Sequence, residues 1–244
     1  MKISQFYLIL VAFLIFSCSK SPEELFDLAE NNLKLDNADE AILNLETLLL
    51  KHPNDSLASK AQYKVSSIYF NWKDEILSGY EALSKTTKNY PNSKQAKQAQ
   101  REIDYFPKFL IDKSESLRKK KKLKESVNHL MYLIDNYPKD KLAPKGQYML
   151  GDLYMNDFRD FEIAIQEYRK VINNHKGSLQ EPHAQFMIGY IYANVLNDID
   201  NAKIEYEKFV RDFKDHELAP SVKFELEYLG KGIDEIPVLK HITS

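Results

Sequence analysis

Hydrophobic residues along this chain recur at the spacing of helices, most clearly between Leu142 and Ser178. Two apolar stripes with steps of three and four residues are separated there by a polar turn. Their members are Leu150, Leu153 and Tyr154 in the first segment, and Ile165, Tyr168 and Ile172 in the second. Gly151 and Ala164 lie inside these stripes, and small residues let two helix backbones approach closely. The segment therefore predicts an antiparallel helix pair.

The same pattern returns at a nearly constant interval along the chain. The small residue of the second helix recurs at Ala41, Gly79, Ser126, Ala164 and Ala202, with intervals of 38, 47, 38 and 38 residues. Self-similarity of this length is typical of helical solenoids, in which each pair buries its apolar face against its neighbours. A sixth unit opens at Leu218–Leu229 without a second helix, which predicts a cap helix over the last apolar face.

These units resemble tetratricopeptide repeats (TPR). In the first repeat, the TPR spacing of small residue, alanine, leucine and proline is kept by Ala29, Ala41, Leu45 and Pro53. Repeats two, four and five carry one extra residue in the turn between their two helices. The third repeat is longer around Pro107, and this proline is expected to break or kink the first helix of that repeat. The resemblance implies an all-α fold, a right-handed α-solenoid of about five TPR-type helix pairs plus a C-terminal cap helix. It also implies that the first helices line a concave groove for protein partners.

The pattern also sets the expected domain organisation. We expect a lipoprotein signal peptide at 1–17, a lipid-anchored tether at 18–21, the TPR solenoid at 22–232 and a C-terminal tail at 233–244. The repeats are expected at about 22–55, 56–93, 94–141, 142–179 and 180–217, with the cap helix at 218–231. Ser21 is the expected N-cap of the first helix, which begins near Pro22.

The amino terminus has the features of a targeting segment. Lys2 precedes an apolar run from Phe6 to Phe16, which is too short to span a bilayer as a helix and fits a signal peptide. The only cysteine of the chain, Cys18, lies two residues after this run, and Ile15-Phe16-Ser17-Cys18 resembles a bacterial lipobox. That resemblance implies cleavage before Cys18 and diacylation of Cys18. Ser19, which follows the cysteine, favours an outer-membrane location facing the periplasm, by resemblance to bacterial lipoproteins. The alternative is an ordinary signal peptide with a chance cysteine.

Charge and motif content argue against several function classes. Removing residues 1–17 removes one of 34 basic residues and none of 36 acidic ones, so the balance becomes 33 against 36, or −3, and nucleic-acid binding is not expected. The sequence has no phosphate loop, nucleophile elbow or Cys-His pair, so it predicts no enzyme, cofactor or small-molecule substrate. None of the six histidines pairs with another at i, i+3 or i, i+4, so no metal site is predicted.

Two sets of residues are candidates for partner binding. The first is a basic run in the turn of repeat three, formed by Arg118, Lys119, Lys120, Lys121 and Lys122. Such a run suits an acidic partner or anionic lipid headgroups, although a solvated turn is the commoner role. The second is an aromatic position repeated in the first helices, at Tyr63, Tyr148, Phe186 and Phe224. These rings either line the groove or pack against the next repeat, and packing is the commoner role.

A lipid-anchored array of TPR units without a catalytic constellation indicates a binding scaffold. The lipobox, the five repeats and the Tyr-Pro endings of second helices resemble the BamD family, the TPR lipoproteins of the outer-membrane β-barrel assembly machinery. This resemblance implies binding to a barrel-insertion partner and to unfolded barrel precursors. The alternatives are a CpoB-like TPR envelope protein that coordinates cell-wall synthesis or division, and a generic TPR adaptor. CpoB-like proteins carry an N-terminal coiled coil, whereas the first repeat here begins soon after Cys18.

Overall fold

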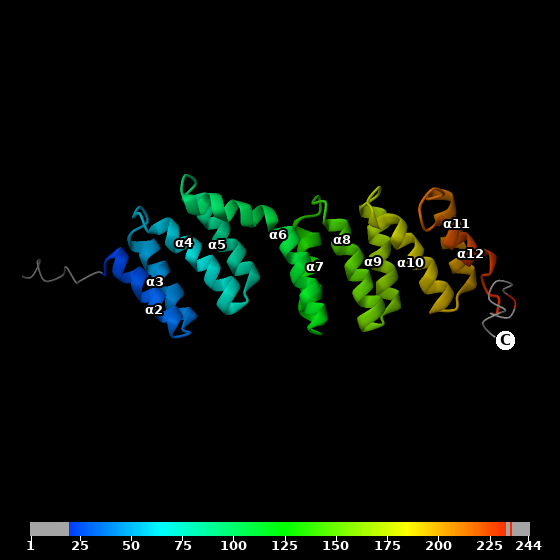
Figure 1. Ribbon diagram of the computed structural model, residues 1–244, viewed down its shortest axis with the longest axis horizontal. Helices are drawn as coiled ribbons and strands as arrows, with labels where there is room; N and C mark the ends of the chain where they lie inside the picture. Colours follow the sequence, from blue (N-terminus) through cyan, green and yellow to red (C-terminus); the bar gives the residue numbers. More distant parts are fainter. Residues whose placement is uncertain (1–19, 233–234, 236–244) are drawn as a thin grey trace, which may run out of the picture. The chain divides into compact units, whose positions relative to one another are not determined.

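The computed structural model describes residues 20–232 and Glu235. The predicted signal peptide, Cys18 and nearly all of the predicted tail lie outside the described residues. Within the described part, every regular element is a helix, as Figure 1 shows. The prediction of an all-α fold built from TPR-type helix pairs is therefore confirmed.

The chain divides into two compact units, the first ending at Tyr105 and the second beginning at Phe106. The first unit contains α2 (Pro22–Lys34), α3 (Ala38–Lys51), α4 (Ala58–Ile68), the π-helix η1 (Tyr69–Lys73) and α5 (Ile76–Asn89). The second contains α7 (Leu123–Asn136), α8 (Ala143–Leu153), the π-helix η2 (Tyr154–Phe158), α9 (Phe161–Asn174), α10 (Gln180–Asn194), α11 (Ile199–Asp212) and α12 (Ala219–Glu227). In each unit, consecutive helices pack against one another.

Helix α6 (Lys94–Lys119) contains the boundary between the two units and also contains Pro107. A break at this proline was one of two expected outcomes, and it is wrong, because α6 continues as a single helix of 26 residues. Proline removes only one backbone hydrogen bond, the one toward the carbonyl of residue 103. The side chains of Phe106, before Pro107, and of Leu110 and Ile111, after it, are buried and hold the helix in place.

Local capping explains where the helices begin and turn. Ser21 forms the expected N-cap of α2: its hydroxyl accepts from the Glu24 N–H (3.2 Å), and its own N–H donates to the Glu24 carboxylate (2.8 Å). Each helix pair then turns through one residue with a positive φ angle, namely Asp36, Asp74, Lys121, Arg159 and Asn197. These turn residues are separated by 38, 47, 38 and 38 residues, the intervals already found for the small residues.

The extra residue of repeats two and four is absorbed by a π-helical turn at the end of the first helix. In repeat two this turn is η1, and in repeat four it is η2. The hydrogen bonds of a π-helix span one residue more than those of an α-helix, so one inserted residue widens the helix end without shifting the register of the next helix. Repeat five has no such turn, and its extra residue falls in the connection between α10 and α11.

The small residues lie at the closest helix contacts, as the sequence pattern predicts. Ala41, Ala164 and Ala202 are fully buried. Gly151 lies against the ring of Tyr168, and Gly189 lies in the same way against Tyr206, 38 residues further along. Repeat three uses serines instead, at Ser114 and Ser126. Their hydroxyls lie 2.7 Å apart, and Ser126 also donates to the Ser114 carbonyl (2.9 Å), so these buried polar groups are satisfied.

A buried carboxylate joins repeats four and five. Arg169 on α9 reaches Glu205 on α11 with two hydrogen bonds of 2.9 and 2.8 Å, and Gln185 and Lys208 donate to the same carboxylate at 2.8 and 2.9 Å. Burial alone would raise the pKa of Glu205, but the hydrogen bonds from Arg169, Lys208 and Gln185 outweigh it and hold the pKa at about 2. The carboxylate is therefore ionised at every physiological pH.

Candidate functional site

The basic run lies where the second unit turns from α6 into α7. Arg118 and Lys119 belong to the last turn of α6, and Lys121 is the residue with a positive φ angle between the two helices. Lys119, Lys120, Lys121 and Lys122 are all exposed, whereas Arg118 is half-buried. Cations at the carboxyl end of a helix are favoured by its dipole, which accounts for the position of this run.

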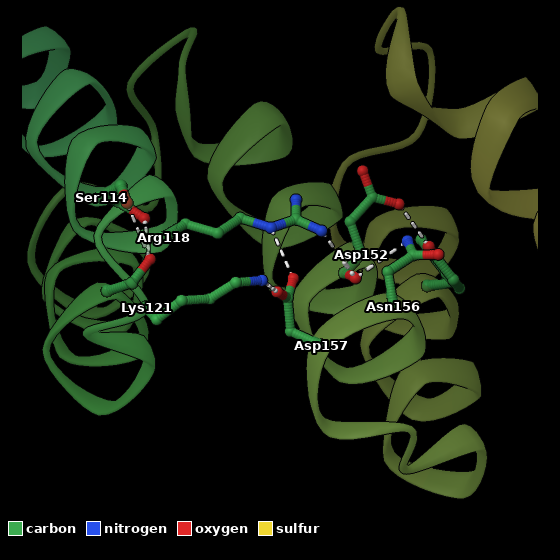
Figure 2. Close-up of polar contacts among 8 residues, drawn as sticks. Ser114, Arg118, Lys121, Asp152, Asn156 and Asp157 are labelled. Carbon is green, nitrogen blue, oxygen red and sulfur yellow. Dashed lines mark hydrogen bonds and ion pairs between the residues drawn. The ribbon is translucent and has the colours of Figure 1, made fainter.

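Two of these cations are bound to the next repeat through Asp157 of η2. Figure 2 shows Arg118 and Lys121 reaching across from the α6–α7 turn to this carboxylate. The Arg118 Nε–H donates to Asp157 at 2.6 Å, and the Lys121 ammonium donates to its other oxygen at 3.3 Å. The Asp157 side chain is only 8% exposed, so the pair is shielded from water on one side. The π-helical turn thus places a carboxylate where it orders part of the basic run.

A second carboxylate, Asp152 on α8, lies beside this pair. Its backbone carbonyl accepts from Arg118 Nη2 at 3.4 Å, and its side chain accepts from the Tyr168 hydroxyl at 2.6 Å. Burial raises the pKa of Asp152, although the hydrogen bond from Tyr168 and the charge of Arg118 act in the opposite direction. Both carboxylates therefore have structural partners.

An open pocket of about 650 Å³ lies over these groups. It is lined by Glu115, Arg118, Lys119, Lys121, Met149, Asp152 and Asp157, all in the second unit. Glu115 is itself paired with Lys145 at 3.1 Å. The pocket combines one apolar side chain, Met149, with charges of both signs.

The aromatic residues at the repeated position have different surroundings. Tyr63 on α4 donates its hydroxyl to Glu102 and accepts from Gln98 at 2.6 Å, so α6 holds it within the first unit. Burial raises the pKa of its hydroxyl, and the hydrogen bond to Glu102 raises it further. This residue therefore has a defined intramolecular role.

The remaining three aromatic residues lie in the second unit. The Tyr148 ring lies 5.3 Å from that of Tyr168, and the Phe186 ring lies 6.2 Å from that of Tyr206, so each packs against the second helix of its own repeat. Phe224 on α12 is 39% exposed and contacts Tyr228 at 4.8 Å. Of these three residues, Phe224 offers the most surface to a partner.

The structure also brings together residues that the sequence pattern did not connect. Arg118 and Asp157 are 39 residues apart, and His183 and His216 are 33 residues apart, yet the imidazole centroids of the latter pair lie 5.3 Å from each other. The first separation is close to the repeat interval of 38 residues, and the second joins the two ends of repeat five. A search for groups spaced by one repeat, rather than by one helical turn, would have found the first pair in the sequence. Cys18, the predicted lipidation site, lies outside the described residues.

Comparison with known families gives two matches. A family described as "Outer membrane lipoprotein", YfiO, matches residues 18–168, which is more than half of the chain, and the match begins at Cys18. A tetratricopeptide repeat family matches residues 183–216. No curated protein matches the sequence.

Several solved TPR structures are similar over most of the chain. MamA from Desulfovibrio magneticus RS-1 is 17% identical with a TM-score of 0.34, and the match covers 82% of this chain and 99% of MamA. YrrB, described as a TPR protein with an unusual peptide-binding site, is 15% identical with a TM-score of 0.38, covering 84% and 92%. A TPR protein from Parabacteroides merdae is 11% identical with a TM-score of 0.38, covering 86% and 73%. Among the described residues, no helix is long and apolar enough to cross a membrane.

Proposed function

The chain belongs to the YfiO family of outer membrane lipoproteins, and we propose that it is a BamD-like scaffold in the assembly of outer-membrane β-barrel proteins. The observation that carries this proposal is the family match itself, which begins at Cys18 and includes every described residue of the first unit and the pocket of the second. Helix pairs of the TPR type present side chains from several repeats to one partner, which is how such arrays bind proteins.

The proposed anchor is a diacylated Cys18 in the outer membrane, with the helix pairs in the periplasm. The short apolar run before Cys18 and the start of the family match at that residue support this location. Two acyl chains are enough for stable attachment to a bilayer, whereas a single chain binds reversibly.

The proposed partners are the barrel-insertion protein and unfolded barrel precursors. The exposed lysines of the α6–α7 turn provide positive charge beside the 650 Å³ pocket, and Phe224 provides an exposed aromatic side chain on α12. Arg118 is not free for such a contact, because Asp157 already binds it. Lys119, Lys120 and Lys122 are the cations proposed to meet an acidic segment of the partner.

Depletion of the protein in its own cells tests the proposed function. Loss of a barrel-assembly scaffold should lower the amounts of β-barrel proteins in the outer membrane, while other lipoproteins stay at their normal amounts. A division or cell-wall defect with unchanged barrel proteins would contradict the proposal and support a CpoB-like role instead. Complementation with wild-type protein and with a Cys18→Ser variant distinguishes the need for the scaffold from the need for the anchor.

A further inference from the structure

Two imidazoles and one carboxylate meet where α10 and the α11–α12 turn lie side by side. One potential ligand atom from each of His183, His216 and Glu217 lies within 4.8 Å of the other two. His183 belongs to the first half of α10, and the other two residues precede α12. The loops before α10 and before α12 lie at the same end of the second unit's helices in Figure 1. Antiparallel packing of α10 against α11 therefore brings the two ends of repeat five together.

We propose that His183, His216 and Glu217 form a binding site for a divalent transition metal ion of the Zn²⁺ class. Imidazole nitrogen and carboxylate oxygen are common zinc ligands, and three protein ligands leave one position for water or for a partner side chain. Ions such as Mg²⁺ and Ca²⁺ are less suitable, because they prefer sites made entirely of oxygen. The proposal is independent of the proposed function, since it depends only on these three residues.

The spacing of the two rings permits coordination of a single ion once their nitrogens, which lie within 4.8 Å of each other, move closer together. With a Zn–N distance of about 2.0–2.1 Å and tetrahedral angles, two imidazole nitrogens lie roughly 3.3 Å apart and their ring centroids about 5.2 Å apart. The observed centroid distance is 5.3 Å, with an angle of 89° between the ring planes. The exposed Glu217 places a carboxylate oxygen within 4.8 Å of a ring nitrogen of each histidine.

The surroundings of His183 orient it as a metal ligand. Its Nδ1–H donates to the Leu179 carbonyl at 3.1 Å, which leaves the Nε2 lone pair free for a metal ion. A backbone carbonyl in this position is a frequent outer partner of zinc-bound histidine. The edge contact with the Tyr148 ring, at 6.4 Å, further limits the motion of the imidazole.

His216 has a competing interaction that metal binding must replace. Its Nδ1 accepts a hydrogen bond from the Leu218 N–H at 3.2 Å, as the Asp55 carboxylate does from Leu57 in the first unit. A metal ion bound at Nδ1 displaces this hydrogen bond. A metal ion bound at Nε2 requires the proton of the neutral ring to be at Nδ1, which then cannot accept from the Leu218 N–H. Either way one neutral hydrogen bond is lost, which is a small cost beside a coordinate bond to a transition metal. Phe209 lies 5.9 Å from the same ring and keeps it in place.

Calorimetric titration with ZnCl₂ tests the site in the mature full-length protein, purified in detergent without a polyhistidine tag. One equivalent should bind with a micromolar or lower Kd, and His183→Ala should weaken binding by about tenfold or more. His216→Asn should weaken it similarly while keeping an acceptor for the Leu218 N–H, as Asp55 does at the matching turn. Circular dichroism confirms that each variant is folded.

His129→Ala is the matched control. Its Nδ1 donates to a carbonyl four residues earlier, as that of His183 does, but it belongs to no cluster of potential ligands among the described residues. This variant should bind Zn²⁺ like the wild type. In hydrogen exchange, Zn²⁺ should slow the amides of α12 in the wild type and leave them unchanged in His216→Asn. Absence of saturable binding, or equal binding by the wild type and His183→Ala, would overturn the proposal.

Discussion

The ring of Tyr168 lies directly against the backbone of Gly151, so that a Cβ added at Gly151 would stand 2.7 Å from Cε1 and 2.8 Å from Cδ1. Tyr168 is fully buried, and its hydroxyl is bound to Asp152, so the ring has no room to move away. The pair shows why the repeat pattern requires a small residue at this point of the first helix. The same arrangement of Gly189 and Tyr206 is the contact of repeat five.

The first prediction is that Gly151→Ala destabilises the protein. Alanine gains about 1 kcal/mol of helix propensity, but overpacking against a fixed ring costs about 1–3 kcal/mol, so we expect a net loss of up to about 2 kcal/mol. Denaturant unfolding measures this difference. Adding Tyr168→Leu to Gly151→Ala makes room for the methyl group, so the double variant should be more stable than the sum of the two single effects. A simple sum would contradict the proposed contact.

The repeats were predictable because spacing in the sequence encodes helix contacts. Ala41, Gly79, Ser126, Ala164 and Ala202 identified every second helix, since the backbone can approach closely only at small residues. The π-helical turns η1 and η2 were visible only as one extra residue, because a sequence does not tell whether an insertion enters a helix or a loop.

The polar contacts between distant parts of the sequence were not predicted. Arg118 and Asp157 come from consecutive repeats, and His183 and His216 come from the two ends of repeat five, so residues close to each of them in the sequence do not indicate either contact. The role of the aromatic position stays a prediction as well, although the packing of Tyr148 against Tyr168 gives it a structural task.

The second prediction concerns the exposed lysines of the α6–α7 turn. Lys119→Glu together with Lys120→Glu should weaken binding of an unfolded barrel precursor by about tenfold at low salt, because the reversed charges repel its acidic groups. Wild-type affinity should fall as salt is added, and affinity of the variant should depend less on salt. Fluorescence titration measures both. Lys203→Glu, an exposed lysine on α11, is the control, and an effect of equal size there would contradict a specific role for the turn.

The third prediction concerns acid stability. The pKa of Glu205 is about 2 in the folded protein, below the ordinary glutamate value of about 4.3. Ionisation of this group therefore stabilises the fold fully at pH values above about 4.3. The contribution, about 3 kcal/mol at most, should be lost as the pH falls from about 4.5 toward 2. In Glu205→Gln, unfolding experiments should show a smaller dependence on pH over this range. An unchanged dependence would show that other carboxylates govern acid unfolding.

The fourth prediction follows from the proposed anchor. The His52 Nε2–H donates to the Lys20 carbonyl at 3.3 Å, so the chain enters α2 beside the carboxyl end of α3. Cys18 precedes Lys20 by two residues, at most about 7 Å of extended chain. Leu50, 82% exposed in the last turn of α3, should therefore lie near the bilayer. Leu35, 78% exposed just before α3, lies about 20 Å away along that helix.

The proposed acylation would leave Cys18 without a free thiol, so Leu50→Cys and Leu35→Cys would each provide one site for a fluorescent label. In vesicles that contain spin-labelled lipid, fluorescence at position 50 should be quenched strongly and fluorescence at position 35 weakly. Equal quenching at the two positions would contradict the expected orientation. Co-sedimentation of the labelled proteins with vesicles shows separately whether the lipid anchor is present.

The proposed role as a lipid-anchored scaffold for β-barrel assembly can be tested by photo-cross-linking in living cells, with a photoreactive residue placed at Lys120 and a control at Lys203. After purification from detergent-solubilised membranes, we expect position 120 to be linked to a large β-barrel protein with periplasmic domains, and the control position not to be linked to it. Links from position 120 to cell-wall synthases, without the barrel protein, would show that the proposed role is wrong.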